Sequence, residues 1–178
     1  MYVGVDLDMD SLRDSTETVR VRANVESLPF PDGFFDLVTS NMVFEHLANP
    51  LAALAEANRV LAYGGVLIIH TASSLHYELL IGRFLSSILP RKTYVKLVSR
   101  YTGRKAEDIF PTRYMVNTAR KFSHGASMAG FEAGLVTHLE TPLSGPVWMR
   151  RIQKQLRKLL PSACKGTILA VYIKRLWA

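Results

Sequence analysis

An acidic side chain follows directly on the first apolar run of the chain. Residues 2–6 read YVGVD, and their apolar, β-branched character predicts a buried strand that ends at Asp6. Open α/β sheets bind ligands at the carboxyl ends of their strands, where a carboxylate can accept both hydroxyls of a ribose. An acid in this region could instead cap the next helix, although Asp8 and Asp10 suit that role better than Asp6.

Two histidines also lie where polar chemistry could be carried out. His46 stands in an EHL segment after the predicted strand 35–40, and His70 ends the predicted strand 66–70. A neutral imidazole can act as a general base near neutral pH, so His46 is the candidate catalytic residue. For both histidines the favoured alternative is a packed, hydrogen-bonded side chain with no part in catalysis.

The elements that must position these residues alternate between strand and helix, which favours an α/β fold with a parallel sheet covered on both faces. Asn49 is a natural N-cap, Pro50 takes the first helical position, and Gly64 with Gly65 is expected to end that helix. Residues 73–114 read as a helical insertion. We expect strands at residues 2–6, 20–24, 35–40, 66–70, 135–140 and 166–174, helices at 49–61, 117–129 and 146–160, and a weaker helix at 10–18.

The composition is that of one globular domain. The chain has 178 residues, of which 48% are hydrophobic, and this is enough apolar material for a substantial core. Cys164 is the only cysteine, which excludes an internal disulfide and a cysteine-built zinc site. We therefore expect a reducing, cytoplasmic location.

Charge is distributed unevenly between the two halves. Residues 1–90 hold 5 basic and 11 acidic side chains, whereas residues 91–178 hold 17 basic and 4 acidic ones. Segment 146–160 concentrates the basic charge on one helical face and apolar residues, among them Trp148 and Ile152, on the other. We favour an ordinary surface helix that packs its apolar face on the sheet; contact with an anionic membrane surface is the alternative. Nucleic-acid binding is disfavoured, because the basic residues lack interleaved aromatics.

Three segments carry a resemblance to a known family. They are GVDLD at 4–8, VESLPFPDGFFDLVTSNMVFEHL at 25–47 and LAALAEANRVLAYGGVLII at 51–69. At this spacing they resemble class I S-adenosylmethionine-dependent methyltransferases of the ubiquinone/menaquinone-biosynthesis type. The resemblance implies a Rossmann-like sheet, S-adenosylmethionine as cofactor, and methyl transfer to a small-molecule, sugar or lipid-like acceptor. It implies no metal.

The resemblance also assigns residues to the adenosine side of the cofactor. Asp6 would accept hydrogen bonds from the ribose, and Leu7 would lie against the adenine. In the family an aspartate before the LPF segment accepts from the adenine amino group. Here Asn24 and Val25 hold these positions, so the charge is missing, and a turn role for Asn24 is equally open.

Other residues would face the methionine moiety and the acceptor. By resemblance, Ser40 and Asn41 border the methionine part of the cofactor. Arg113 and Tyr114, in the helical insertion, are guessed contacts to the methyl acceptor.

The family's glycine-rich turn has no counterpart in this sequence. In the family a strand and a G-x-G-x-G turn precede the GVD strand and let the backbone approach the cofactor. That strand lies between those corresponding to 2–6 and 35–40, so its loss would leave two buried edges unpaired. We interpret the chain as truncated at its N-terminus; a degraded homologue, or a strand supplied by a partner chain, are the alternatives. Alone, it is expected to bind S-adenosylmethionine weakly or not at all.

The predicted organisation is a single domain over residues 1–178. It comprises a partial cofactor-binding core (1–72), a helical cap (73–115) and C-terminal helices and strands (116–178). The first functional hypothesis is a methyltransferase. The alternative is a non-catalytic interaction or regulatory protein of the same fold, for which a location at the membrane surface is left open. A nicotinamide-binding protein is disfavoured, because the SLPFPDGFFD and RVLAYGG segments have no role there.

Overall fold

A computed structural model describes residues 2–13, 18–102, 113–143 and 146–176, so part of the expected cap, residues 103–112, lies outside the described residues. The expected α/β class is confirmed, and the expected strands and the helices expected at 49–61, 117–129 and 146–160 are present within a few residues. The weaker helix expected at 10–18 is described only as far as Arg13, since residues 14–17 lie outside the described residues. In chain order the elements are β1 (Val3–Asp6), α1 (Met9–Arg13), β2 (Val19–Arg22), β3 (Phe35–Asn41), α2 (Pro50–Val60), β4 (Leu61–Ala72), α3 (Tyr77–Ile88), α4 (Arg91–Thr102), α5 (Ala119–Met128), β5 (Leu135–Glu140), α6 (Val147–Leu159), the 3-10 turn η2 (Ser162–Cys164) and β6 (Gly166–Ile173).

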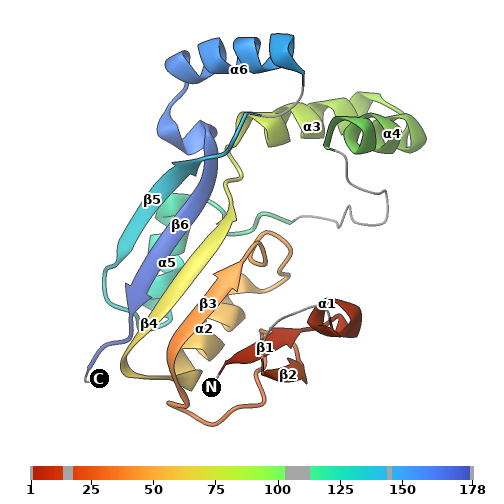
Figure 1. The fold of residues 1–178 in the computed structure, drawn as a ribbon. Helices are drawn as coiled ribbons and strands as arrows, with labels where there is room; N and C mark the ends of the chain where they lie inside the picture. Colours follow the sequence, from red (N-terminus) through yellow and green to blue (C-terminus); the bar gives the residue numbers. More distant parts are fainter. Residues whose placement is uncertain (1, 14–17, 103–112, 144–145, 177–178) are drawn as a thin grey trace.

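The strands form two separate sheets. β1 pairs in parallel with β2, and a four-stranded sheet has the order β3-β4-β6-β5. β3 and β4 are parallel, whereas β6 runs antiparallel to β4 and to β5. The larger sheet is therefore mixed, and the expectation of a parallel sheet was wrong in this respect. The reason is the path of the chain: α6 lies beyond the end at which β5 finishes, so β6 starts there and runs back (Figure 1).

A gap in strand pairing separates the two sheets. Within the described residues β1 pairs only with β2, and β3 pairs only with β4. Each of these strands thus keeps one edge without a strand partner, on the sides where the resemblance expects a further strand. The side chains of these strands are only partly covered: β1 is half-buried over most of its length, and Leu37 in β3 is 52% exposed. That these edges are buried stays a prediction.

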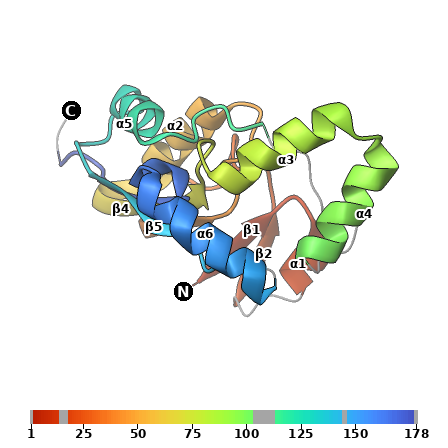
Figure 2. The same cartoon turned by 90° about the horizontal axis from the view of Figure 1, so that it is seen from above.

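The hydrophobic core lies on one face of the four-stranded sheet. Figure 2 shows α2 and α5 together on one side of that sheet. The core is built from Leu54 and Ala57 of α2, Phe122 and Ala126 of α5, and apolar residues of β4 and β6. From Gly65 onward the residues of β4 that face this core are buried, and the alternate ones are half-buried. Helices therefore cover one face well, and the expected cover on both faces is incomplete in the described part of the chain.

Helix α2 begins as expected and ends earlier. The Asn49 side chain accepts a hydrogen bond from the Ala52 N–H at 3.2 Å, and Pro50 opens the helix. The helix ends at Val60, and Leu61 is already extended, so Gly64 and Gly65 do not end it. Both glycines lie inside β4, where Gly64 takes a positive φ of 76°. A β-carbon on Gly65 would stand 2.8 Å from the Ala62 carbonyl oxygen, so this irregular start of β4 needs glycine.

Helices α3, α4 and α6 lie beyond the end of β4, outside the core (Figure 1). The favoured prediction for α6, an apolar face packed on the sheet, was wrong. The buried residues of α6 are Gln153 and Arg157, while Trp148 and Ile152 are 61% and 52% exposed. The cause is polar anchoring: Arg157 donates to the Thr141 carbonyl at 2.6 Å, and Gln153 donates to a Glu78 carboxylate oxygen at 3.2 Å.

Candidate functional site

The exposed carboxylate predicted at the end of the first strand is present. Asp6 is the last residue of β1, and its Oδ1 accepts a hydrogen bond from the Asp8 N–H at 2.9 Å, which shapes the turn into α1. Within the part of the chain that the structure describes, Oδ2 has no hydrogen-bond partner. Leu7 beside it is 61% exposed. The end of β1 therefore offers an acceptor oxygen next to an exposed apolar side chain.

The next predicted pair, Asn24 and Val25, is joined to this strand end through the backbone. The Ala23 N–H donates to the Asp6 carbonyl at 3.1 Å. The Asn24 Oδ1 accepts from the Glu26 N–H at 3.0 Å, so the side-chain oxygen forms a turn, as the open alternative expected. The Val25 side chain packs against the main core. Asp6, Leu7, Asn24 and Val25 thus form one group at the end of the β1–β2 sheet.

The loop after Val25 is fixed to α2 by Arg59. Its guanidinium donates to the Leu28 and Phe30 carbonyls at 2.9 and 2.8 Å and to both carboxylate oxygens of Glu56 at 2.8 Å. Hydrogen bonding to Arg59 lowers the pKa of Glu56 below its ordinary value. The RVLAYGG segment therefore contributes an arginine that holds the LPFPDG loop in place.

Ser40 and Asn41 lie at the end of β3, where a hydrogen-bonded chain crosses the sheet. Ser40 is half-buried. The Asn41 Oδ1 lies 2.8 Å from the His70 Nδ1, and the His70 Nε2 lies 2.8 Å from the Thr167 Oγ1. Both ring nitrogens of His70 are therefore engaged, so the geometry favours the packed alternative for this histidine. The chain links β3, β4 and β6 at one end.

A buried polar network that sequence reasoning missed lies next to this chain. Glu45 is 2% exposed, and its Oε2 accepts a hydrogen bond from the Thr71 hydroxyl at 2.6 Å. The Asn117 amide donates to the Thr71 hydroxyl at 2.8 Å and to the Ala72 carbonyl at 3.0 Å, while the Asn117 Oδ1 is buried without a protein partner among the described residues. The available signal was Glu45 itself, an acid directly after Phe44 in the apolar stretch before His46.

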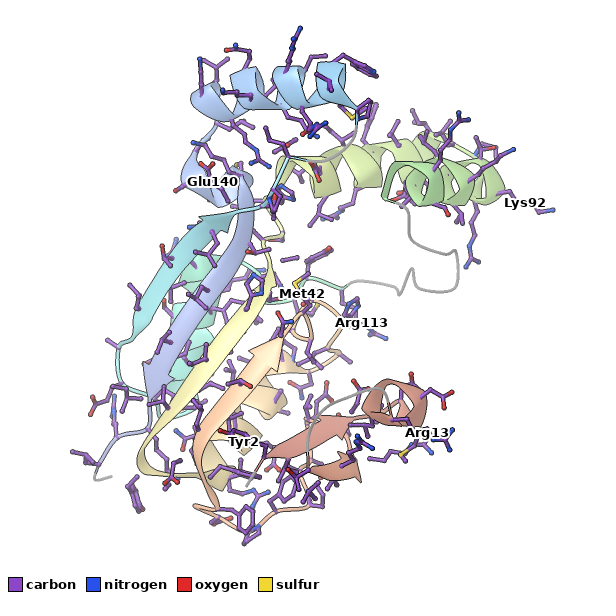
Figure 3. All side chains as sticks on the ribbon, viewed as in Figure 1. Tyr2, Arg13, Met42, Lys92, Arg113 and Glu140 are labelled. Atoms are coloured by element: carbon purple, nitrogen blue, oxygen red, sulfur yellow. The ribbon has the colours of Figure 1, made fainter. Side chains whose placement is uncertain are left out.

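The guessed acceptor contacts lie at the same end as this network. The backbone N–H groups of Arg113 and Tyr114 donate to the Glu45 carbonyl at 2.7 and 3.2 Å. Met42 and Tyr114 both have positive φ angles, 54° and 50°, which are rare for residues other than glycine and cluster at binding sites. Figure 3 shows Met42 and Arg113 beyond β3, on the side of α3 and α4.

His46, the candidate catalytic residue, follows Glu45 directly. Its N–H donates to the Val43 carbonyl at 2.9 Å in a short turn, and the residue is half-buried. Its catalytic role stays a prediction. Among the described residues no three His, Cys, Asp or Glu side chains gather as a metal site.

The structure thus gathers the predicted residues into two groups. Asp6, Leu7, Asn24 and Val25 belong to the β1–β2 sheet; the second group, which contains Ser40, Asn41, His46, Arg113 and Tyr114, lies where β3 ends. The gap in strand pairing lies between β1 and β3, and Val25 contacts the core of the larger sheet.

Comparison with known proteins finds sequence similarity to methyltransferases over the first part of the chain. Residues 1–69 match the model of the family described as methyltransferase domain. A 60-residue segment is 42% identical to the ubiquinone/menaquinone biosynthesis C-methyltransferase UbiE of Shewanella sp. (strain ANA-3) and covers 34% of this chain and 24% of that protein. The chain therefore spans about a quarter of the length of the curated relatives it matches.

Similar solved structures cover nearly the whole chain. A SAM-dependent methyltransferase of Thermotoga maritima, a possible histamine N-methyltransferase, has a TM-score of 0.65 at 16% identity, over 98% of this chain and 73% of that one. A putative methyltransferase of Haloferax volcanii, solved with its Trm112 activator, has a TM-score of 0.62 at 17% identity, over 97% and 71%. At these identities the likeness shows the fold.

Proposed function

We propose that this chain, which carries methyltransferase-domain sequence in residues 1–69 and has the fold of class I S-adenosylmethionine-dependent methyltransferases, binds S-adenosylmethionine and serves methyl transfer. The observation that carries the proposal is the exposed Asp6 carboxylate at the end of β1, whose Oδ2 has no partner in the described part of the chain. A carboxylate there can accept both ribose hydroxyls.

The residues present fit the adenosine half of the cofactor. Asp6 would hold the ribose, and the exposed Leu7 would contact the adenine face. Asn24 fits less well, because its side-chain oxygen already accepts from Glu26. For the methionine half, Ser40 and Asn41 are the candidates, and the sequence supplies no G-x-G-x-G turn beside them. The fit is therefore good for adenosine and incomplete for methionine.

The acceptor would lie near the end of β3. Bound S-adenosylmethionine supplies an electrophilic methyl group on its sulfonium, and a transferase acts largely by holding the acceptor in line with it. Glu45, Thr71 and Asn117 form a buried network that would hold the Met42–His46 segment and the Arg113–Tyr114 backbone in fixed positions. His46 would act as a base only for an acceptor that must lose a proton. A small, lipid-like acceptor is favoured by the similarity to UbiE.

Calorimetric titration of S-adenosylmethionine tests the proposal. The 178-residue chain should bind, but with an affinity weaker than micromolar, because only the adenosine side is well formed. Asp6→Asn keeps the Oδ1 that accepts from Asp8 while removing the charge, so it should weaken binding about 10-fold or more. Asp10→Asn changes the same charge on α1 and should leave the affinity unchanged. Equal affinities for all three proteins would overturn the assignment, and micromolar binding would overturn the incomplete fit.

One observation favours a second candidate, a non-catalytic protein of the same fold. It is the gap in strand pairing between β1 and β3, which borders the proposed cofactor site. Under this alternative the chain gives no heat with S-adenosylmethionine under any condition. The titration separates the two candidates: weak, saturable binding of S-adenosylmethionine that Asp6→Asn reduces supports the enzyme.

A further inference from the structure

Helix α6 is packed so that its apolar face points away from the protein. Along this face Trp148, Ile152, Leu156 and Leu159 are 61%, 52%, 41% and 84% exposed. The positions 148, 152, 156 and 159 recur at helical spacing, so they form one continuous stripe. Exposing four large apolar side chains on one helix costs free energy in water, and such a stripe marks an interaction surface.

The orientation of α6 is fixed by polar contacts on its inner edge. Arg157 is buried, donates to the carbonyl and hydroxyl oxygens of Thr141 at 2.6 and 3.3 Å, and lies 5.9 Å from the centre of the Tyr77 ring. Gln153, one turn earlier, is also buried and donates to Glu78. Turning the apolar stripe inward would break these bonds and leave a buried polar junction unsatisfied. The exposed stripe is therefore held in place by the packing of the helix.

Charge on the same helix indicates what covers the stripe. Arg150, Arg151, Lys154 and Lys158 are all exposed, and residues 146–160 contain no acidic side chain. None of the ion pairs among the described residues involves α6. A helix with an apolar stripe beside several unpaired cations has the pattern of helices that lie in the headgroup region of anionic membranes. No described helix is long and apolar enough to cross a bilayer.

We propose that α6 docks on the surface of an anionic phospholipid bilayer. Trp148, Ile152, Leu156 and Leu159 enter the boundary between headgroups and acyl chains, while the four exposed cations contact lipid phosphates. The inference is independent of methyl transfer, since it rests on α6 alone. It has a consequence for the orientation of the protein: α6 lies beyond the end of β4, so docking brings that end of the sheet toward the membrane (Figure 1).

Flotation with lipid vesicles tests the proposal. The full chain should float with vesicles of phosphatidylcholine mixed with phosphatidylglycerol, and far less with phosphatidylcholine alone or at high salt. The variant R150Q/R151Q/K154Q/K158Q should lower the partition coefficient about fivefold per charge removed. The matched variant R91Q/K92Q/K96Q/R100Q removes four exposed cations from α4, where they line a separate surface depression of about 740 Å3. An equal loss in both variants would show general charge attraction and overturn a role for α6.

The apolar stripe needs its own test. W148Q/I152Q should abolish flotation, whereas M128Q/L135Q, which alters two side chains 66% and 62% exposed on α5 and β5, should not. In a W177F background, Trp148 fluorescence should shift to shorter wavelength when anionic vesicles are added. Light scattering, which measures the oligomeric state, can show the result that would contradict the proposal. If the chain forms dimers that W148Q/I152Q disrupts, and no vesicle binding occurs, the stripe is a protein interface and the proposal fails.

Discussion

The carboxylate of Glu45 accepts a hydrogen bond from the Thr71 hydroxyl at 2.6 Å, and both residues are buried. This bond joins the segment after β3 to the end of β4. The Asn117 amide donates to the same hydroxyl, so Thr71 stands between a buried carboxylate and a buried amide.

Replacing Thr71 by valine should therefore destabilise the protein. Valine has nearly the same shape as threonine but no hydroxyl. The Glu45 carboxylate therefore loses the donor at residue 71, and one Asn117 N–H loses its acceptor there. A buried polar group that loses its partner costs about 1–3 kcal/mol. Urea unfolding should show a loss of that size for Thr71→Val and a much smaller one for Thr71→Ser, which keeps the hydroxyl. If the valine variant is as stable as the serine variant, the network contributes nothing to stability.

A second prediction concerns the loop held by Arg59. Arg59→Lys keeps the charge but cannot bind Glu56 through two nitrogens while also donating to the Leu28 and Phe30 carbonyls. The amides of residues 28–33 should then exchange with solvent faster than in the original chain. The exchange rates of the amides in α6, which lies away from this loop, serve as the internal reference. Unchanged exchange in the loop would mean that other contacts hold it.

The contacts beneath α6 should make the free energy of unfolding depend on pH, because His76 lies beside Thr141, to which Arg157 donates. Burial lowers the pKa of His76 below its ordinary 6.5; neighbouring Glu78 raises it and Arg157 lowers it, and burial dominates. Because the folded pKa lies below the unfolded one, folding disfavours the protonated imidazole. This contribution to stability is complete above about pH 6.5 and is lost as the pH falls through the folded pKa. Unfolding free energies measured between about pH 7 and pH 5 should fall in the original chain.

His76→Gln is the control for this dependence. Glutamine cannot titrate in that range, so the variant should lose less stability over the same pH interval. Equal slopes in both proteins would assign the pH dependence to other groups.

The gap between the sheets predicts a pattern of amide exchange. β4 is paired on both sides over Val66–His70 and β6 over Thr167–Val171, whereas β1 and β3 each have one unpaired edge among the described residues. Protection should therefore be high over Val66–His70 of β4 and Thr167–Val171 of β6 and should be incomplete in β1 and β3. Full protection of β3 at high protein concentration, lost on dilution, would show instead that a second copy pairs with this edge.

Much of the fold could be predicted from local sequence. Asn49 and Pro50 set the start of α2, and apolar periodicity located the strands, because both signals act within a few residues. Strand direction could not be predicted: whether β6 runs parallel or antiparallel depends on where α6 lies. The orientation of α6 was also wrong, because apolar content favoured burial, whereas two contacts distant in sequence, from Arg157 to Thr141 and from Gln153 to Glu78, decide it.

In the candidate site, too, local features could be predicted from the sequence and long-range contacts could not. Asp6 was predicted from its place after an apolar run, and the structure keeps it exposed at a strand end. The Glu45–Thr71–Asn117 network could not be predicted, because its members are 26 and 46 residues apart in sequence and meet only through tertiary packing.

A titration followed by backbone amide chemical shifts shows directly whether the end of β1 binds the adenosine part of S-adenosylmethionine. If it does, the amides of Asp6, Leu7, Asn24 and Val25 should shift on titration, and these shifts should be lost in Asp6→Asn. Shifts that are absent, that persist unchanged in Asp6→Asn, or that occur only at the basic residues of α4 would contradict binding at this site.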